Sequence, residues 1–405
     1  AKRHAYSMRA KWGATKDGKI LAAQCEIWAN GGAYAYTSTK VLGNATLLAS
    51  GPYEIPNVAT DAYAVYTNDI PGGAFRGFGG PQAAFMAELQ VDKLADALKM
   101  DPVELRMRNL FKEGSVISMG SVLPEGVTIR EVTERCALEA GWTKMETGWT
   151  RPIPPKSENA DVKSAWSLVC GFKNVGFSYG APENCGATIQ LEGNEKIELA
   201  RLYHSGAEVG QGSHTIFTQI AAEALGLPLS KIHTYFSDTA TSLNAGSVSA
   251  SRMTHMAGNS IIGAAKLALE RWAEGNRPAL GSFVYRPPKT TPMDPVDGHC
   301  YPNFTYGYVA QAFLVDVDTR TGNVQLREVI SVDDVGKAIN PQLVEGQIEG
   351  AVVQAAGYSL MEDWKKKDAK TLTDRLSRYL IPTVRDIPVK TRSVIMELAD
   401  PIGPY

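Results

Sequence analysis

The stretch at residues 71–82, with the sequence PGGAFRGFGGPQ, constrains the fold of this chain more than any other. Glycines allow a backbone to adopt positive φ angles and to approach another molecule closely. A strand-like run over 60–68 precedes this loop, and an amphipathic helical pattern opened by Pro81 follows it. This layout predicts a backbone cradle for an anion, with amides and a helix N-terminus pointing outward. A glycine-rich corner needed only for packing would show the same spacing.

The same loop carries two aromatic side chains and a guanidinium, which a bare phosphate loop does not need: Phe75, Phe78 and Arg76. Gln82 stands where the dinucleotide fingerprint GxGxxG requires its third glycine, so the loop does not match that fingerprint. Arg76 suits a phosphate or an oxo group on a metal, although an ordinary salt bridge would use it equally well.

The bulk composition excludes several classes of protein. The 405 residues are enough for two or three domains, and 44% hydrophobic and 21% charged residues are typical of globular proteins. A net charge of -2 gives no reason to expect a nucleic acid or an anionic membrane as a partner. No apolar run approaches the length of a membrane span, and the first residues do not resemble a signal peptide.

The five cysteines are scattered, odd in number and without a CxxC pair. A disulfide scaffold, a zinc site and a cysteine-ligated iron–sulfur cluster within this chain are therefore not expected, and we predict a cytoplasmic protein. The six histidines show no HExxH spacing, and the chain has neither a GxSxG elbow nor a P-loop. The sequence therefore assigns no metal-ligating side chain and no catalytic nucleophile.

The order of predicted elements indicates an α+β protein with two mixed α/β sections, at 1–115 and 166–405. Residues 116–165 are predicted to connect them irregularly, with one helix near 130–140. Hairpins are expected around 16–19 and over 309–332. Helix starts are expected at Asp101-Pro102 and Asn340-Pro341, because Asp or Asn followed by proline is typical of helix N-termini.

Several small-residue turns in this chain each lead into a predicted helix N-terminus, at 72–81, 209–213, 245–251 and 336–341. One such turn is common, but several together indicate a single large, phosphate-bearing ligand held by backbone groups from many loops. Gln211 stands between two glycines, so its amide can reach a ligand, or it can be a solvated turn residue. The serines at 247–251 can present hydroxyls to an anion or simply cap a helix.

Two aromatic residues, Phe78 and Phe177, can stack a planar substrate, although aromatic residues more often belong to a core. Gln347 shares one side of its predicted helix with Gly350 and Gln354, which suits either a ligand contact or a packed interface.

At these motifs the chain resembles the molybdenum-binding subunit of the xanthine dehydrogenase/aldehyde oxidase family of molybdenum hydroxylases. The matching pieces run in the family's order and cover nearly the whole chain. They are Thr67-Asn68, AFRGFGGPQ at 74–82, DPVELR at 101–106 with Asn109, VGQG at 209–212, SASR at 249–252 and GQIEG at 346–350.

The resemblance implies that a molybdopterin, possibly as its cytosine dinucleotide, holds the metal, which is why no protein ligand set is needed. It places Phe75 and Arg76 beside the molybdenum. It places Gln211 on a second cofactor loop and Ser247, Val248 and Ser249 on a third. It implies that Gln347 contacts the pterin. Phe78 resembles an aromatic residue that stacks on the substrate, and Phe177 its partner on the opposite face.

Two departures from the family bear on the substrate and one on catalysis. Asn44 stands where purine-oxidising members have an arginine, which weighs against a purine. The loop has Phe-Arg where carbon monoxide dehydrogenases insert a cysteine. The family's catalytic glutamate is expected shortly after Tyr405, and its first glycine-rich loop before Ala1. We therefore expect a middle portion of the subunit that is inactive alone, with no catalytic residue of its own.

The resemblance implies a hydroxylase that oxidises an aldehyde or an N-heteroaromatic C–H carbon with water as its oxygen source. Electrons would leave through FAD and 2Fe–2S clusters on other subunits or regions, in a full assembly that is a dimer. Two alternatives remain: a non-catalytic apo fragment or scaffold, and an unrelated protein that binds a phosphate-bearing ligand.

Overall fold

The computed structural model describes residues 2–368, 370–398 and 400–405. The first half of the chain contains β1 (Tyr6–Ala14), β2 (Ile20–Gly32), α1 (Ser38–Leu48), β3 (Asn57–Tyr66), α2 (Gly80–Leu98), α3 (Pro102–Asn109), α4 (Ile129–Glu139), β4 (Thr143–Met145), β5 (Gly148–Thr150), β6 (Val162–Asn174), β7 (Cys185–Gly193) and β8 (Ile197–His204). The second half contains α5 (Ser213–Leu225), the 3₁₀ helix η1 (Leu229–Lys231), β9 (Ile232–Phe236), α6 (Met253–Ala273), β10 (Ala279–Tyr285), β11 (Tyr306–Asp318), β12 (Val324–Asp334), α7 (Pro341–Leu360), β13 (Lys366–Lys367), β14 (Lys370–Thr371) and β15 (Lys390–Met396).

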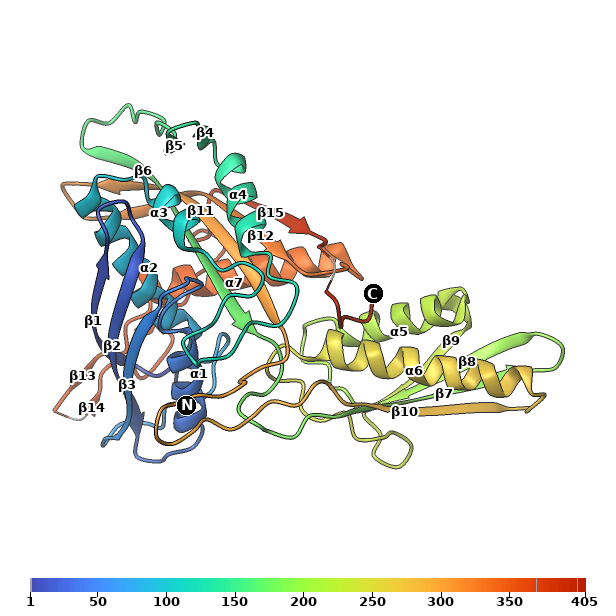
Figure 1. Cartoon of the computed structure of the whole chain (residues 1–405). Coiled ribbons are helices and arrows are strands. Elements are labelled where there is room, and N and C mark those ends of the chain that lie inside the picture. Colours follow the sequence, from blue (N-terminus) through green and yellow to red (C-terminus); the bar gives the residue numbers. More distant parts are fainter. Residues whose placement is uncertain (1, 369, 399) are drawn as a thin grey trace.

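Three main sheets organise the described chain (Figure 1), in the orders β1-β2-β3, β10-β7-β8-β9 and β15-β12-β11-β6. Each sheet combines antiparallel neighbours with one parallel pair, namely β2/β3, β8/β9 and β12/β15. A helix lies between the strands of each parallel pair in the chain, respectively α1, α5 and α7. Parallel neighbours need such a crossover, whereas antiparallel strands can be joined by a tight turn. The predicted α+β class, with mixed sheets and loops leading into helices, is confirmed.

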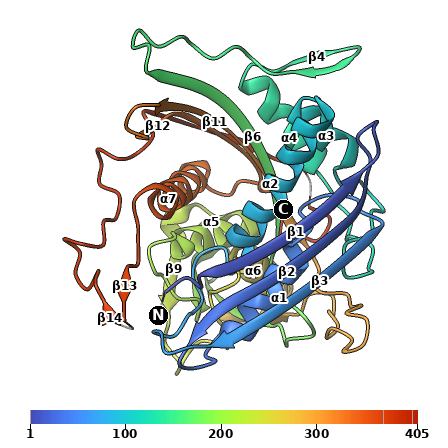
Figure 2. The same ribbon diagram turned by 90° about the vertical axis from the view of Figure 1, so that its left-hand side faces the viewer.

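Two hydrophobic cores lie beneath these sheets. The first contains buried side chains from β1 and β2, from the helices α1–α4 and from β6, β11 and β12, and partly buried side chains of β3 pack against it. The second lies between the β7–β10 sheet and the helices α5 and α6. Figure 2 shows the N-terminal sheet facing the viewer, with the long strands β6, β11 and β12 passing behind it. The predicted division into two sections and a connecting segment, at 1–115, 116–165 and 166–405, stays a prediction. The two cores show how side chains pack and do not define domain boundaries.

The predicted helix ends are confirmed by their caps. The side chain of Asp101 accepts a hydrogen bond from Val103 N at 2.8 Å, and that of Asn340 accepts one from Leu343 N at 3.1 Å. Each satisfies an amide that has no partner within the helix. Gly226 ends α5 in the left-handed conformation, as expected of a glycine there.

Several elements are absent from the sequence-based prediction, and the longest of them are α1, β10 and β15. Helix α1 follows a strand directly and contains buried Ser38 and Asn44, so its polar residues obscure the apolar face. Strand β10 alternates small and exposed residues because α6 covers one of its faces, and a Cβ on Gly281 would collide with the Ala264 carbonyl of that helix. Within the described residues no helix is long and apolar enough to cross a membrane.

One buried histidine predicts how stability depends on pH. His204 is fully buried, and its Nδ1 accepts a hydrogen bond from Gly206 N at 2.9 Å. Burial lowers the pKa of His204 to about 4. The unfolded chain binds the proton near pH 6.5 and the folded chain only near pH 4, so stability is full above 6.5 and falls as the pH drops between these values.

We expect urea unfolding to show a loss of about 2 kcal/mol between pH 7 and pH 5 from this group. His204→Gln should flatten the profile by that amount, whereas His233→Gln, at an exposed position, should leave it unchanged. An identical slope in both variants would contradict this assignment.

Candidate functional site

The helices α2, α5, α6 and α7 each begin at one of the predicted small-residue turns. The first two turns contact α7, and the third contacts the segment that follows β6. Gly79 and Gly212 cap α2 and α5 with φ angles of 86° and 84°, which favour glycine. Gly212 of the second turn packs closely on α7, because a Cβ there would lie 2.6 Å from Leu343 Cδ1. At the third turn, Ala250 O accepts a hydrogen bond from Gly176 N at 2.9 Å. Figure 1 shows α7 between the N-terminal sheet and the α5/α6 layer.

Arg76 joins the first turn to α7. Its Nη2 donates to the backbone oxygen of Gln347 at 2.8 Å and to the side-chain Oε1 of Gln347 at 3.0 Å. Gly350, one turn further along α7, lies beneath the guanidinium, because a Cβ there would be 3.5 Å from Arg76 Nη1. Burial lowers the pKa of Arg76, and an arginine remains charged at neutral pH despite such a shift. Two predicted cofactor residues, 271 positions apart, are thus brought together.

Phe75 is 40% exposed and packs against Arg3 of the N-terminal segment. The Arg3 guanidinium lies between the rings of Phe75 and Tyr358, at 4.5 and 4.6 Å from their centroids. Its Nη2 donates to Arg76 O at 2.8 Å. This cation holds the backbone of the loop that carries Phe75 and Arg76, and sequence reasoning did not identify it.

Some of the buried polar atoms that have no hydrogen-bond partner among the described residues lie around this first turn. They include Arg3 Nε and Nη1, His4 Nδ1, Tyr6 Oη and Gln82 Oε1. The group is compact: Gln82 Nε2 donates to His4 O at 3.0 Å, and a Cβ on Gly79 would lie 3.3 Å from Tyr6 Oη. Because buried polar groups in proteins are almost always paired, this set of donors and acceptors fits a polar ligand or segment beside the turn.

The second turn differs from the predicted anion cradle. Glu208 accepts from the amides of Gly210 and Gly212 through Oε1, at 2.8 and 3.0 Å, and from His214 N through Oε2, at 3.2 Å. A carboxylate of the chain itself therefore takes the N-terminal amides of α5, which an anionic ligand would otherwise use. These amides, and the helix dipole behind them, suit that negative charge.

Gln211 bonds within the same turn. Its Oε1 accepts from Val209 N at 2.7 Å, and its Nε2 donates to Ala207 O at 3.0 Å and to Ser213 Oγ at 2.7 Å. The residue is partly buried, and its place at a ligand stays a prediction.

Arg252 holds the third turn. The residue is 1% exposed, and its Nη1 donates to the carbonyls of Ala245 and Ser247 at 2.9 and 2.8 Å. Its Nε donates to Glu183 at 2.7 Å. Ser247 Oγ in turn accepts from Ser249 N at 3.2 Å. Arg252 belongs to the quoted motif, but only its buried position shows that it organises the turn.

The remaining member of the third turn points inward. Val248 packs against the second hydrophobic core, so its side chain anchors the turn. The following residues Ala250 and Ser251 have φ angles of 62° and 52°, an uncommon conformation for non-glycine residues.

Asn44 and Phe78, two predicted substrate residues, are in direct contact. Asn44 Nδ2 donates to Phe78 O at 2.7 Å, and Phe78 has a φ of 50°. Lys173, at the end of β6, donates to Asn44 Oδ1 at 3.3 Å. The lysine was not identified from the sequence, since nothing in its neighbourhood marks it.

Phe177, the other predicted aromatic partner, lies by the Arg252 guanidinium, 5.5 Å from its ring centroid. Tyr179 instead contacts the helix that carries Asn44, because its Oη donates to Gly43 O at 2.6 Å. Opposed stacking of Phe78 and Phe177 stays a prediction, and Tyr179 is a further aromatic residue beside Asn44.

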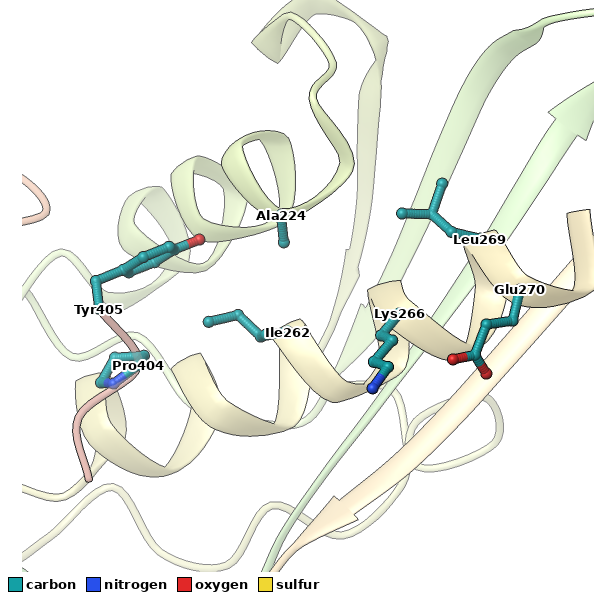
Figure 3. Close-up of a pocket in the computed structure, with 7 residues that line it drawn as sticks. All are labelled: Ala224, Ile262, Lys266, Leu269, Glu270, Pro404 and Tyr405. Atoms are coloured by element: carbon teal, nitrogen blue, oxygen red, sulfur yellow. The ribbon is translucent and has the colours of Figure 1, made fainter. Parts of the chain in front are cut away.

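Cavities in the described structure do not mark this site by themselves. A cavity of ≈ 420 Å³ lies between α5 and α6, lined mainly by apolar side chains and bounded by Pro404 and Tyr405 (Figure 3). A smaller one, of ≈ 190 Å³, reaches Ser251 at the third turn. The described residues contain no cluster of three or more His, Cys, Asp or Glu side chains able to hold a metal ion.

Comparisons with known proteins show which family this chain is similar to. Models described as molybdopterin cofactor-binding domains match residues 1–110 and, for a second model, residues 143–282 and 273–388. Xanthine dehydrogenase of Oryza sativa subsp. japonica is 30% identical and aligns with 98% of this chain, which spans 30% of that protein. A protein of Bacillus subtilis named as one subunit of a probable xanthine dehydrogenase is 30% identical over all of this chain, which spans 57% of it.

The solved structure of the aldehyde oxidoreductase from Desulfovibrio gigas superposes with a TM-score of 0.88 at 27% identity. It aligns with 100% of this chain and 44% of its own. The chain thus spans about a third to rather more than half of the length of these proteins.

Proposed function

The chain belongs to the xanthine dehydrogenase/aldehyde oxidase family of molybdopterin cofactor-binding proteins, and from this we propose that it is the cofactor-holding part of a molybdenum hydroxylase. The proposed substrate is an aldehyde or an N-heteroaromatic compound that is oxidised at a C–H carbon, with water as the oxygen source. The contact between Arg76 and Gln347 carries the proposal, because it joins two predicted cofactor residues from opposite parts of the sequence.

The residues proposed to hold the molybdopterin lie on the turns described above. Phe75 and Arg76 belong to the first turn, Gln211 to the second and Ser247, Val248 and Ser249 to the third, with Gln347 on α7. When bound, the group supplies two-electron oxidation chemistry, as cofactors rather than side chains do in such enzymes. The chain's own residues bind and orient it, and the unpaired donors of Arg3 support a polar ligand there.

We assign the general base to neither carboxylate that lies at these turns. Glu208 is held by three amides of its own loop, and Glu183 is paired with Arg252 at 2.7 Å. Both carboxylates are occupied by these bonds, so neither is free to take a proton from a reacting group. A glutamate after Tyr405 remains the proposed base.

The proposal also extends to the substrate and the partners. The aldehyde oxidoreductase named above supports an aldehyde, and Asn44 in place of an arginine weighs against a purine. The Bacillus subtilis relative carries the name of one subunit among several, which supports separate FAD and iron–sulfur partners. A cytoplasmic location and a dimeric assembly stay predictions.

Metal and pterin analysis of the chain tests the proposal. We expect the protein, produced together with molybdenum-cofactor maturation factors, to purify with molybdenum and pterin in equal amounts. Arg76→Ala should lower the content by about tenfold or more, because charged hydrogen bonds contribute about 1.5–3 kcal/mol. Arg9→Ala, at a side chain that is 81% exposed, serves as the control and should keep both.

Other results would favour the alternatives. A bound nucleotide without molybdenum would identify a protein that binds a different phosphate-bearing ligand. A folded protein with neither molybdenum, pterin nor nucleotide would identify a scaffold and refute the proposal.

A further inference from the structure

A lysine without a counter-ion among the described residues lies beside two predicted substrate residues. Lys173 Nζ donates to Asn44 Oδ1 and to Asn174 O, both at 3.3 Å, and also contacts Asn174 Oδ1. Its side chain passes the first turn, because Lys173 Cδ lies 3.6 Å from where a Cβ of Gly80 would be. That distance is an ordinary van der Waals contact, so the glycine-rich turn and the lysine stem lie against each other.

Each of these contacts is to a neutral oxygen. None of the ion pairs formed by the described residues includes Lys173, although such pairs occur from one end of the chain to the other. Some of the side chain remains accessible, yet burial lowers its pKa to about 7. Enclosing an ammonium group without an opposite charge is unfavourable, so its retention indicates a partner that is not part of the described chain.

Several polar and aromatic groups around Lys173 are held in place by one another. Asn44 bridges the lysine to Phe78, accepting from Nζ and donating to Phe78 O at 2.7 Å. Tyr179 is fixed by its hydrogen bond to Gly43 O at 2.6 Å, next to Asn44. The hydroxyl of Tyr6 has no partner among the described residues and approaches Gly79. Cation, amide and aromatic groups therefore converge at the turn that carries Phe78.

We propose that Lys173, together with Asn44, determines specificity by selecting substrates that carry an anionic oxygen, such as a ring carboxylate, on the edge away from the oxidised carbon. The inference deepens the proposed function and rests on it, since it places the substrate against Phe78. In this proposal the ammonium group of Lys173, on β6, takes the place of the arginine guanidinium that purine-oxidising members have at the position of Asn44. A purely structural lysine, satisfied by Asn174, is the alternative.

Two matched substrates test this with the molybdenum-loaded enzyme and its partners: 4-formylbenzoate and 4-formylbenzamide, which differ in the charge of one group. We expect kcat/KM to favour the carboxylate by about tenfold or more, the range of a charged hydrogen bond. Lys173→Met should abolish the preference, and Lys173→Arg should restore part of it. The control is Lys163→Met at the exposed start of the same strand, which should retain it.

Binding by the chain itself gives a readout independent of turnover. In calorimetry the chain should bind benzoate more tightly than benzamide by about tenfold, and Lys173→Met should bind both equally. Equal binding by the unchanged chain, or a preference that survives Lys173→Met, would overturn the inference. An enzyme that holds molybdenum and oxidises both aldehydes equally would refute this inference alone. Absence of molybdenum and pterin would instead refute the proposed function. The comparison of benzoate with benzamide binding would then still decide whether Lys173 selects an anionic group.

Discussion

Arg106→Met is expected to lower the free energy of unfolding by about 3–5 kcal/mol, because it leaves a buried carboxylate without its partner. The Arg106 side chain is 0% exposed and lies 2.8 Å from Glu88 Oε2 and 2.9 Å from Asp92 Oδ1. Glu88 also accepts from Cys170 N at 3.0 Å and from the hydroxyl of Tyr53. The ion pair therefore joins α2 and α3 to β6 inside the first core. Urea unfolding measures the loss.

Two further variants separate the buried pair from an ordinary one. Arg135→Ala removes an i,i+4 pair with Glu139 whose arginine is 50% exposed, and should cost only about 0.3–0.5 kcal/mol. Adding Glu88→Gln to Arg106→Met should recover part of the stability, because the unpaired charge is then gone. Equal losses for Arg106→Met and Arg135→Ala would show that the buried pair contributes no more than an exposed one.

Arg252→Lys is expected to lower the molybdenum and pterin content of the purified protein by about tenfold or more, since it removes several charged hydrogen bonds that shape the third turn. Arg252 reaches Ala245 O, Ser247 O, Asn184 O and Glu183 from one planar group. A lysine has one ammonium centre and cannot make this fork of bonds. Metal analysis measures the effect, and limited proteolysis near residues 245–251 should show a loosened turn.

The matched control for this variant is Arg271→Lys, near the other end of the same helix, where the guanidinium contacts Leu280 O at an exposed position. It should retain the metal and resist proteolysis as before. A cofactor content that is unchanged in Arg252→Lys would show that the third turn does not depend on this arginine, and would weaken its place in the proposed site.

The local architecture was readable from the sequence because it depends on neighbouring residues. Asp101-Pro102 and Asn340-Pro341 cap helices through their own side chains, and Gly226 ends one through its own φ angle. The order of turns and helices, the α+β class and the family motifs follow from such short-range signals. Helix α1 does not follow from the local sequence, because its buried Asn44 is satisfied by a hydrogen bond to Phe78, which lies 34 positions away.

The sequence by itself determined that several glycine-rich turns lead into helices and that Arg76, Gln211 and Gln347 are candidates for one ligand. Only the tertiary structure decided which polar groups remain free for it. Glu208 takes the amides of the second turn, Arg252 fixes the third, and Lys173 reaches Asn44 without a counter-ion among the described residues. The reason is physical: whether a polar group is available depends on every hydrogen-bonding and charged neighbour in space, and those neighbours come from strands and helices far apart in the chain.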